Sequence, residues 1–326
     1  MTERPLVRLA ARGSPLALWQ ARRVATLLAA SGTDSSLVVV ETAGDRRADV
    51  PLEDLGGQGI FVKEVQAAVV DGTADAAVHS AKDLPASEAL AVPGLVLAAV
   101  PERADPRDLL VGGTIDRLPT GSVVATGSAR RRVQLANLRP DLTFTGLRGN
   151  LATRLAAVGV GPVAAVVVAK AATDRLGWSP PAGLSVQVLE PESMLPQVGQ
   201  GALAVECRAD DSTTRAALAL IDDPAVGLPV RAERAFLAEL GGGCTLPVGA
   251  HAVRAGSDGE SITLTGMMAS ADGAVVIRHA ADGQRPDALG RSVARYLLDD
   301  AGGRDLGEWL PFPAAGSPNA PSAEEP

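Results

Sequence analysis

The chain has 326 residues, which predicts two or three domains, each large enough to bury a core without disulfides or metals. Its net charge of −8 disfavours a nucleic-acid or anionic-membrane binder, since such proteins are expected to be basic. Its 2% aromatic content argues against a platform on which bases stack. The two cysteines, Cys207 and Cys244, exclude a disulfide scaffold and a four-cysteine zinc site, and we expect no metal. The charged start has no apolar signal segment and no apolar run could span a bilayer, so we expect a cytoplasmic protein.

Strand-like and helical patterns alternate along the first hundred residues. A helix is predicted after Ser14, which stands as N-cap before Pro15. The predicted helices cover 16–30 and 60–70, and the predicted strands cover 7–11, 37–41, 75–79 and 95–100. This alternation predicts a mostly parallel sheet with helices on its faces.

A second set of the same kind begins near residue 105. Its predicted strands are 109–111, 122–126, 143–147, 163–169 and 186–189. A strand at 202–207 and a helix at 211–221 follow. The pattern alone leaves open which sheet the strand at 202–207 joins.

The order of the predicted elements changes after residue 222. A helix at 228–240 is followed by the letters GGGC and a closing helix is predicted at 286–300, with strand-like runs between them at 248–253, 261–270 and 274–280. These elements predict a small α+β domain. Residues 311–326 contain five prolines and no apolar period, which predicts a disordered tail.

Positive charge is concentrated between Ser128 and Arg154. This segment has six arginines, no lysine and one acid, Asp141, although the whole chain is acidic. Guanidinium groups bind carboxylates or phosphates in a bidentate manner, and ligands of open α/β sheets bind beyond the carboxyl ends of the strands. The cluster therefore indicates either a site for a polyanionic small molecule or a solvated helix face with ordinary ion pairs.

Two further residues are candidates for chemistry. Asp83 directly follows a predicted strand and could act as an acid or base, or could stabilise a cation, although a turn or N-cap role is the commoner one. Cys244 lies in GGGCTLPVG, where a flexible loop would expose its nucleophilic thiol. The alternative for a cysteine is a small buried hydrophobe, which suits Cys207 better.

Ten short motifs occur along the chain in a fixed order: RGSPLALWQA, GDR, GGQGIFVKE, DAAVHSAKDLP, ERADPRD, TGSARRR, LRGNLATR, VGQGALAVECR, AERAFLAELGGGC and PVGA. Together they resemble the hydroxymethylbilane synthase family, also called porphobilinogen deaminases. The resemblance runs from about residue 7 to 250 and continues more weakly to about 310.

The resemblance implies an α/β fold with two lobes like those of periplasmic binding proteins, plus a small α+β domain that carries the cofactor. The implied domains are residues 1–100 with 199–221, residues 101–198, and residues 222–310, followed by the tail at 311–326. On this basis the strand at 202–207 returns to the first lobe. The family expectation is a monomer.

The resemblance also implies the activity. The family condenses four porphobilinogen molecules into hydroxymethylbilane with release of ammonia, on a dipyrromethane cofactor bound by a thioether, here to Cys244. Asp83 matches the catalytic aspartate, whose carboxylate can stabilise the cation left when ammonia departs. The residues that match substrate- and cofactor-binding positions are Arg12, Ser14, Lys82, Ser128, Arg130, Arg131, Arg148, Arg154 and Arg175. Asp54, Gln58, Gly127 and Gly241 depart from the family pattern.

Two other functions stay open on the residues. A non-catalytic solute-binding module would share the two lobes, because fold does not fix function. A cysteine hydrolase would use Cys244 with a base such as His251. We expect the transferase, because an anion binder has no use for a carboxylate among arginines or for a thiol on a glycine loop.

Overall fold

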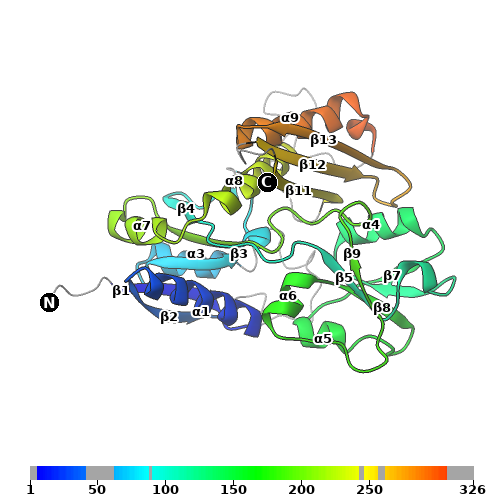
Figure 1. Ribbon diagram of the computed structural model, residues 1–326, viewed down its shortest axis with the longest axis horizontal. Helices are drawn as coiled ribbons and strands as arrows, with labels where there is room; N and C mark the ends of the chain where they lie inside the picture. Colours follow the sequence, from blue (N-terminus) through cyan, green and yellow to red (C-terminus); the bar gives the residue numbers. More distant parts are fainter. Residues whose placement is uncertain (1–5, 42–61, 88–89, 242–245, 256–260, 307–326) are drawn as a thin grey trace, which may run out of the picture.

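The computed structural model describes residues 6–41, 62–87, 90–241, 246–255 and 261–306. Its strands form three sheets, each with its own helices (Figure 1). We call the part around β1–β4 and β10 the first lobe, at the left of the view, and the part around β5–β9 the second lobe, at the right. The part around β11–β13 is the C-terminal domain, which lies above both lobes in the view.

The sheet of the first lobe has the strand order β2-β1-β3-β10-β4. Strand β1 pairs in parallel with β2 and β3, whereas β10 is antiparallel to both of its neighbours. Four of the five strands therefore run in one direction. The bounds are β1 (Leu6–Arg12), β2 (Asp34–Val40), β3 (Ala76–Ser80), β4 (Leu95–Ala99) and β10 (Leu203–Arg208).

Helices cover both faces of this sheet. Because side chains alternate along a strand, Leu9 of β1 contributes to the core under α1 and α7, and the next residue, Ala10, to the core under α3. The bounds are α1 (Pro15–Ala30), α3 (Lys63–Val70) and α7 (Ser212–Ala219).

The second lobe repeats this arrangement with the order β7-β6-β8-β5-β9, in which β5 is the single reversed strand. Helix α4 packs on one face through Leu135, and α5 on the other through Leu151 and Leu155. The strands are β5 (Asp108–Val111), β6 (Val123–Ala125), β7 (Thr143–Thr145), β8 (Val163–Ala169) and β9 (Val186–Leu189). The helices are α4 (Ala129–Leu138), α5 (Leu151–Leu155) and α6 (Lys170–Arg175).

The C-terminal domain is an antiparallel sheet with two helices on one face. Phe236 of α8 lies fully buried in the core between the helices and this face of the sheet. On the other face, Met267 and Ala269 of the sheet pack against Val133 of α4. The turn between β12 and β13 approaches α4 so closely that a Cβ on Gly273 would lie 2.5 Å from the Val133 carbonyl oxygen. The bounds are α8 (Pro224–Glu239), β11 (Val248–Ala255), β12 (Ser261–Ala269), β13 (Val276–Gly283) and α9 (Pro286–Arg295).

Two segments cross between the lobes, residues 100–107 from β4 to β5 and residues 190–202 from β9 to β10. They run side by side, because Arg103 and Ala202 form an antiparallel bridge and Ala104 N donates to Gly201 O at 3.0 Å. Since β4 also pairs with β10, and β5 with β9, one antiparallel ribbon runs from the first sheet into the second. Gly201 has a φ of +87°, and a Cβ there would lie 2.4 Å from the Ala104 carbonyl oxygen, so the ribbon requires glycine at this position.

The predicted α/β fold, with two sheets of mostly parallel strands and a small α+β domain, is confirmed. The strand expected at 202–207 lies in the first sheet, where the resemblance placed it. Most element ends differ from the prediction by a few residues, and the last predicted helix changes to a π-helical turn at Tyr296–Asp300. The exact domain limits stay a prediction, and residues 311–326 lie outside the described part of the chain.

Among the helices of the described residues, none is long and apolar enough to cross a membrane.

Candidate active site

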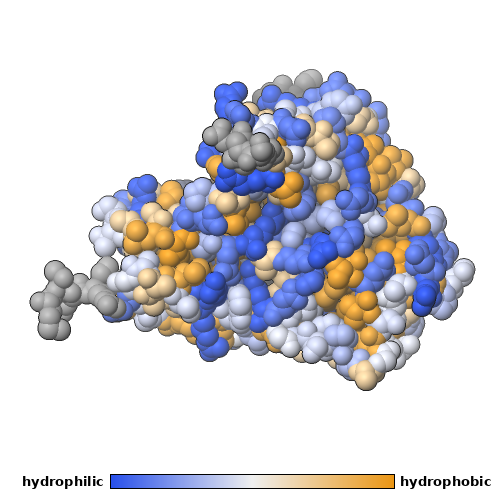
Figure 2. Space-filling view, in the orientation of Figure 1, coloured by the Kyte–Doolittle hydropathy of each residue, from blue (hydrophilic) through white to orange (hydrophobic). Residues whose placement is uncertain are grey.

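The predicted site residues of both lobes follow the carboxyl ends of parallel strands, which is where open α/β sheets bind ligands. In the first lobe Arg12 ends β1 and Ser14 follows it, while Lys82 and Asp83 follow β3. In the second lobe Ser128 follows β6, Arg148 follows β7 and Arg175 ends α6, the helix after β8. Hydrophilic residues run along the boundary between the lobes, below the C-terminal domain (Figure 2). The two sheets therefore bring these residues to facing edges.

Both predicted serines are helix N-caps. Ser14 Oγ accepts a hydrogen bond from Ala17 N at 3.3 Å, and Ser128 Oγ accepts one from Arg131 N at 3.4 Å. Each hydroxyl keeps its own proton for donation to a ligand. The positive end of the helix dipole behind each serine also favours an anion at that place.

Asp83 ends a single 3₁₀ turn, Ala81–Asp83, directly after β3. Its side chain is half-buried and caps no helix. Within the described part of the chain its carboxylate accepts no hydrogen bond and is in no ion pair, although the charges of Lys82 and Arg154 act on it. A half-buried carboxylate that lies near cations and has no hydrogen bond of its own fits a residue that contacts a ligand better than one that only stabilises a turn.

Lys82 lies beside Asp83 and donates from Nζ to Gln200 Oε1 at 3.2 Å. Burial and the nearby guanidinium of Arg131 lower the pKa of Lys82 to about 8, against the opposing effect of Asp83 and Asp108. The ammonium is therefore held in a region that already has an excess of positive charge.

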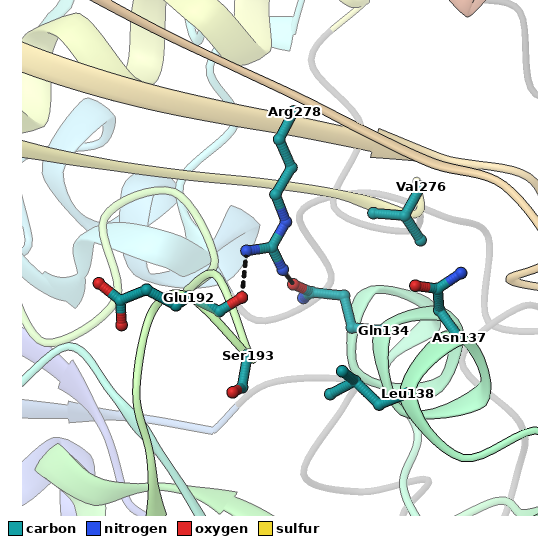
Figure 3. Close-up of a pocket in the computed structure, with 7 residues that line it drawn as sticks. All are labelled: Gln134, Asn137, Leu138, Glu192, Ser193, Val276 and Arg278. Carbon is teal, nitrogen blue, oxygen red and sulfur yellow. Dashed lines mark hydrogen bonds between the residues drawn. The ribbon is translucent and has the colours of Figure 1, made fainter.

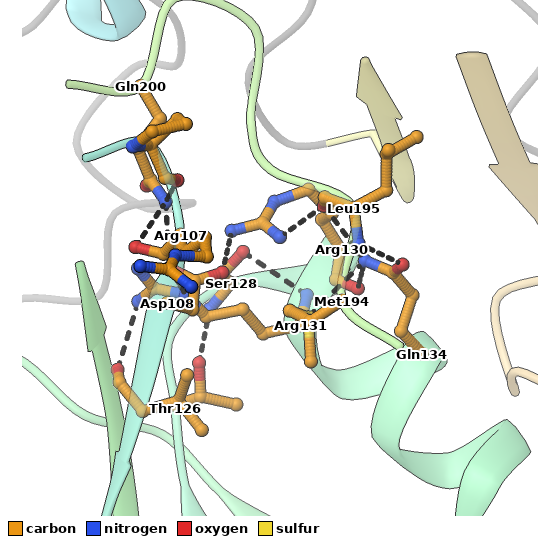
Figure 4. Close-up of polar contacts among 12 residues, drawn as sticks. Arg107, Asp108, Thr126, Ser128, Arg130, Arg131, Gln134, Met194, Leu195 and Gln200 are labelled. Atoms are coloured by element: carbon orange, nitrogen blue, oxygen red, sulfur yellow. Dashed lines mark hydrogen bonds and ion pairs between the residues drawn. The ribbon is translucent and has the colours of Figure 1, made fainter. Parts of the chain in front are cut away.

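Arg130 and Arg131 share one buried carboxylate, that of Asp108 at the start of β5 (Figure 4). Arg130 Nη2 lies 2.7 Å from Asp108 Oδ2, and Arg131 Nη2 lies 2.7 Å from Asp108 Oδ1. Arg130 Nη1 also donates to Leu195 O (2.6 Å), and Arg131 Nη1 to Val167 O (2.9 Å). Burial alone would raise the pKa of Asp108, but the two guanidinium groups outweigh burial and hold that pKa well below its usual range.

The arginine cluster of the sequence thus divides by partner. Arg130 and Arg131 are buried and held by Asp108, while Arg139 is tied to Asp141 by an ion pair of 2.6 Å. Neither a purely solvated face nor a purely ligand-binding set describes the segment. The sequence reading missed Asp108, although a pair of buried arginines requires a carboxylate and ERADPRD offers one at a strand start.

Three further arginines of the set have unsatisfied or crowded guanidinium groups. Arg148 Nη1 and Arg175 Nε are buried without a hydrogen-bond partner among the described residues. Burial and repulsion from Arg131 and Arg148 lower the pKa of Arg154, against the opposing effect of Asp83. Buried donors without acceptors are costly, so their number here fits a ligand that brings several carboxylates.

Arg175 also joins the two lobes. Its Nη2 donates to Gly201 O at 2.7 Å, and its guanidinium lies over the ring of Trp19 of α1, 5.3 Å from the centroid. Burial lowers the pKa of Arg175. A residue of α6 in the second lobe thus contacts both the crossing ribbon and a helix of the first lobe.

The structure therefore brings Lys82 and Asp83 of the first lobe together with Arg131, Arg148 and Arg154 of the second. Arg12 ends β1, the parallel neighbour of β3, and Ser14 follows it at the same sheet edge.

Three residues singled out in the sequence, Cys244, Asp54 and Gln58, lie outside the described residues. The nearest described residues on either side of Cys244 are Gly241 and Leu246. At Gly127, a further departure from the family pattern, a Cβ would lie 2.9 Å from Leu147 O. Cys207 is the small buried hydrophobe expected, and burial raises its pKa to about 11. Among the described residues no cluster of His, Cys, Asp and Glu is arranged to hold a metal ion.

A separate cavity of about 240 Å³ lies where α4, β13 and the second crossing segment meet (Figure 3). Arg278 crosses it and donates to Glu192 O and to Gln134 Oε1. The cavity lies at a junction between domains, and Asp83 is not among its lining residues. The guanidinium of Arg278 is already hydrogen-bonded to the protein there.

Comparison with known proteins decides the family. The profile described as "Porphobilinogen deaminase, dipyromethane cofactor binding domain" matches residues 7–216, and the profile of the C-terminal domain of the same enzymes matches residues 228–299. The chain belongs to the porphobilinogen deaminase family. A porphobilinogen deaminase of Syntrophus aciditrophicus is 46% identical over 93% of this chain and 98% of its own length, and one of Brevibacillus brevis is 45% identical over 92% and 96%.

Comparison with solved structures found partial similarity to binding proteins. A periplasmic substrate-binding protein from Coxiella burnetii is 14% identical, covers 70% of this chain and 96% of its own, and has a TM-score of 0.41. A nutrient-binding protein from Burkholderia cenocepacia bound to methionine is 13% identical, covers 68% and 93%, and has a TM-score of 0.42. These scores are too low for the likeness to bear on function.

Proposed function

We propose that this porphobilinogen deaminase family member condenses four porphobilinogen molecules head to tail into hydroxymethylbilane, with release of ammonia, and that Asp83 is its catalytic residue. Family membership over nearly the whole chain supports the reaction. The observation that carries the assignment of Asp83 is its carboxylate, which accepts no hydrogen bond from the described residues and lies among cations at the facing edges of the two lobes.

The chemistry of the substrate accounts for this arrangement. Loss of ammonia from an aminomethylpyrrole leaves a cation, and a fixed carboxylate can accept hydrogen bonds from pyrrole N–H groups and stabilise that charge. The Asp83 carboxylate can also take the proton released at the attacking pyrrole carbon. Arginines would repel the cation at this place, so they serve the carboxylates at the periphery of the substrate.

The dipyrromethane cofactor belongs to the same proposal. Its attachment point is Cys244, and the residues that would hold its carboxylates are Ser14, Lys82, Ser128 and the arginines at positions 12, 131, 148, 154 and 175. When bound, it supplies the acceptor end on which the product grows. The unpartnered buried donors Arg148 Nη1 and Arg175 Nε fit a group with several carboxylates.

Arg130 is a member of the predicted binding set whose protein contacts support a structural role, as do those of Arg131. Its two terminal nitrogens are taken by Asp108 and Leu195 O, and it is 2% exposed. We propose that it contributes to ligand binding through its hold on Asp108, which orients Arg131.

The intact mass of the purified protein, compared with that of Cys244→Ala, tests the function. We expect an excess of two pyrrole units in the parent and a bare chain in the variant, because the thioether needs the thiol. The parent should also release ammonia from porphobilinogen. A parent without adduct that neither gains mass nor releases ammonia on incubation with porphobilinogen would instead support the solute-binding module.

The same proposal includes a cytoplasmic monomer as the working form. Light scattering of the purified holoprotein at micromolar concentration tests the oligomeric state, and a mass near 33.1 kDa is expected.

A further inference from the structure

Gln200 lies at the centre of the contacts between the two lobes. It belongs to the second crossing segment and is fully buried, between two glycines with positive φ, Gly199 and Gly201. This part of the segment lies directly against the turn Ala81–Asp83. A Cβ on Gly199 would lie 3.1 Å from Lys82 N, and Ala81 N donates to Ala202 O at 3.0 Å.

The amide of Gln200 contacts both lobes at once, and Figure 4 shows its contacts on the side of the second lobe. Its Oε1 accepts from Lys82 Nζ at 3.2 Å on the side of the first lobe. Its Nε2 donates to Asp108 Oδ1 at 2.8 Å and to Pro106 O at 2.7 Å on the side of the second lobe. One side chain therefore joins the lysine beside Asp83 to the carboxylate that holds Arg130 and Arg131.

Only an amide meets both demands. An ammonium needs an acceptor, and a carboxylate and a carbonyl each need a donor. Asn and Gln alone present an acceptor and two donor hydrogens on one planar group. A glutamate would place an oxygen against the oxygens of Asp108 and Pro106. A methionine would fill the same space and leave Lys82 and Asp108 without this partner.

We propose that Gln200 is a positioning residue that fixes the Lys82 ammonium, and with it the Asp83 turn, relative to the Asp108–arginine pair of the second lobe. The effect on turnover rests on the proposed function, in which Asp83 is catalytic, whereas the effect on Lys82 does not.

The titration of Lys82 gives a direct readout. Among the described residues, the charged groups that act on its ammonium are Asp83 on its own turn, Arg131 on α4, Asp108 on β5 and Arg154 on α5. The chain contains only three lysines, Lys63, Lys82 and Lys170, so a protein labelled with ¹³C-lysine gives three Cε signals in NMR spectra. The variants Lys63→Arg and Lys170→Arg assign the Lys82 signal by elimination.

The sign of the expected shift differs between two variants. Gln200→Met removes an acceptor of the ammonium, so the pKa of Lys82 should fall by roughly one unit below its value of about 8. Gln200→Glu places a carboxylate beside the ammonium, so the pKa should rise. The alkaline limb of the kcat/KM profile with porphobilinogen should move in the same directions, and kcat of the methionine variant should drop about tenfold because the turn is misplaced.

Gln134→Met is the matched control. Gln134 is also a buried glutamine whose amide holds this crossing segment, with Oε1 accepting from Leu195 N at 2.8 Å, but it contacts neither Lys82 nor Asp108. It should lose thermal stability without moving the Lys82 titration.

Unchanged titration of Lys82 in folded Gln200→Met and Gln200→Glu would overturn the proposal, as would an equal shift in Gln134→Met. If the parent fails to turn over porphobilinogen while the Lys82 shifts appear as expected, the proposed function is wrong and the positioning role stands.

Discussion

Arg130 and Arg148 carry the same group on the same lobe, and their guanidiniums differ in how many partners they have. Both terminal nitrogens of Arg130 donate to protein acceptors and only its Nε is buried without one, whereas no nitrogen of Arg148 has an acceptor among the described residues. When a buried charge is paired, the protein loses folding stability if the partner is removed. When a buried donor has no acceptor, it lowers folding stability as long as it is present. Sequence similarity treats the two residues alike, but their partners assign them different roles.

Arg148→Leu and Arg130→Met form a matched test of this difference. Arg148→Leu should change the free energy of unfolding by less than about 1 kcal/mol, because it removes an unsatisfied donor, yet should raise KM or prevent cofactor assembly. Arg130→Met should lower the free energy of unfolding by roughly 3–5 kcal/mol, because it leaves Asp108 with one counter-charge fewer. Urea denaturation with intact mass measures both; equal stability losses would refute the distinction.

Asp83→Asn should fold as the parent does, because the carboxylate has no hydrogen-bond partner to lose among the described residues. The neutral amide cannot stabilise the developing cation, so turnover should fall by about three orders of magnitude. Steady-state ammonia release and a thermal melt measure the two effects. Near-normal turnover would remove Asp83 from the mechanism.

At the scale of elements, periodicity and capping residues predicted most strands and helices. The run at 163–169 matched β8, and Ser14 caps the helix that follows it, as predicted. These features are local, so they can be read from a short window. The membership of β10 in the first sheet depends on contacts across more than a hundred residues, and only the resemblance supplied it.

The site shows the same limit. Its cations and Asp83 could be named from motifs, but Asp108 and Gln200 could not be recognised as their partners. Gln200 contacts Lys82 and Asp108 across 118 and 92 residues, and Asp108 contacts its two arginines across 22 and 23 residues. Nothing in the local pattern distinguishes a carboxylate that binds two arginines from one that ends a turn.

The crossing ribbon allows a test at one glycine. Gly201→Ala should cost roughly 2–4 kcal/mol, because it combines a left-handed backbone with a Cβ placed 2.4 Å from Ala104 O. Gly183→Ala is the control, since Gly183 has a φ of +84° and nothing within 4 Å of the added Cβ, and should cost about 1 kcal/mol. Urea denaturation compares them, and equal losses would mean that the close approach costs nothing.

At the scale of the whole molecule, α8 ties the C-terminal domain to both crossing segments. Glu233 is fully buried and binds Arg103 of the first segment at 2.7 Å, Gly199 N of the second at 2.7 Å and Ala252 N of β11 at 2.8 Å. The next residue, Arg234, donates to Pro85 O at 2.7 Å, just after the turn that ends at Asp83. Two neighbouring side chains thus link three parts of the fold to the site.

Arg103→Met should lower the free energy of unfolding by roughly 3–5 kcal/mol, because Glu233 would stay buried without its counter-charge. The double variant with Glu233→Gln should recover part of that loss, because the amide removes the uncompensated charge. Chemical denaturation of the two single variants and the double variant closes the cycle. Additive losses would show that the pair is not coupled.

The antiparallel ribbon has a consequence for how the chain is built. Strands β4 and β10 are neighbours in one sheet, and the chain that leaves the first returns to the second at the Arg103–Ala202 bridge. A tight turn at that bridge would make the pair an ordinary hairpin, with every strand of the first sheet still in place. The second lobe therefore occupies the position of a hairpin loop, between two paired strands of the first sheet. Its length and internal connections can vary between relatives without rerouting a strand of the lobe that holds it.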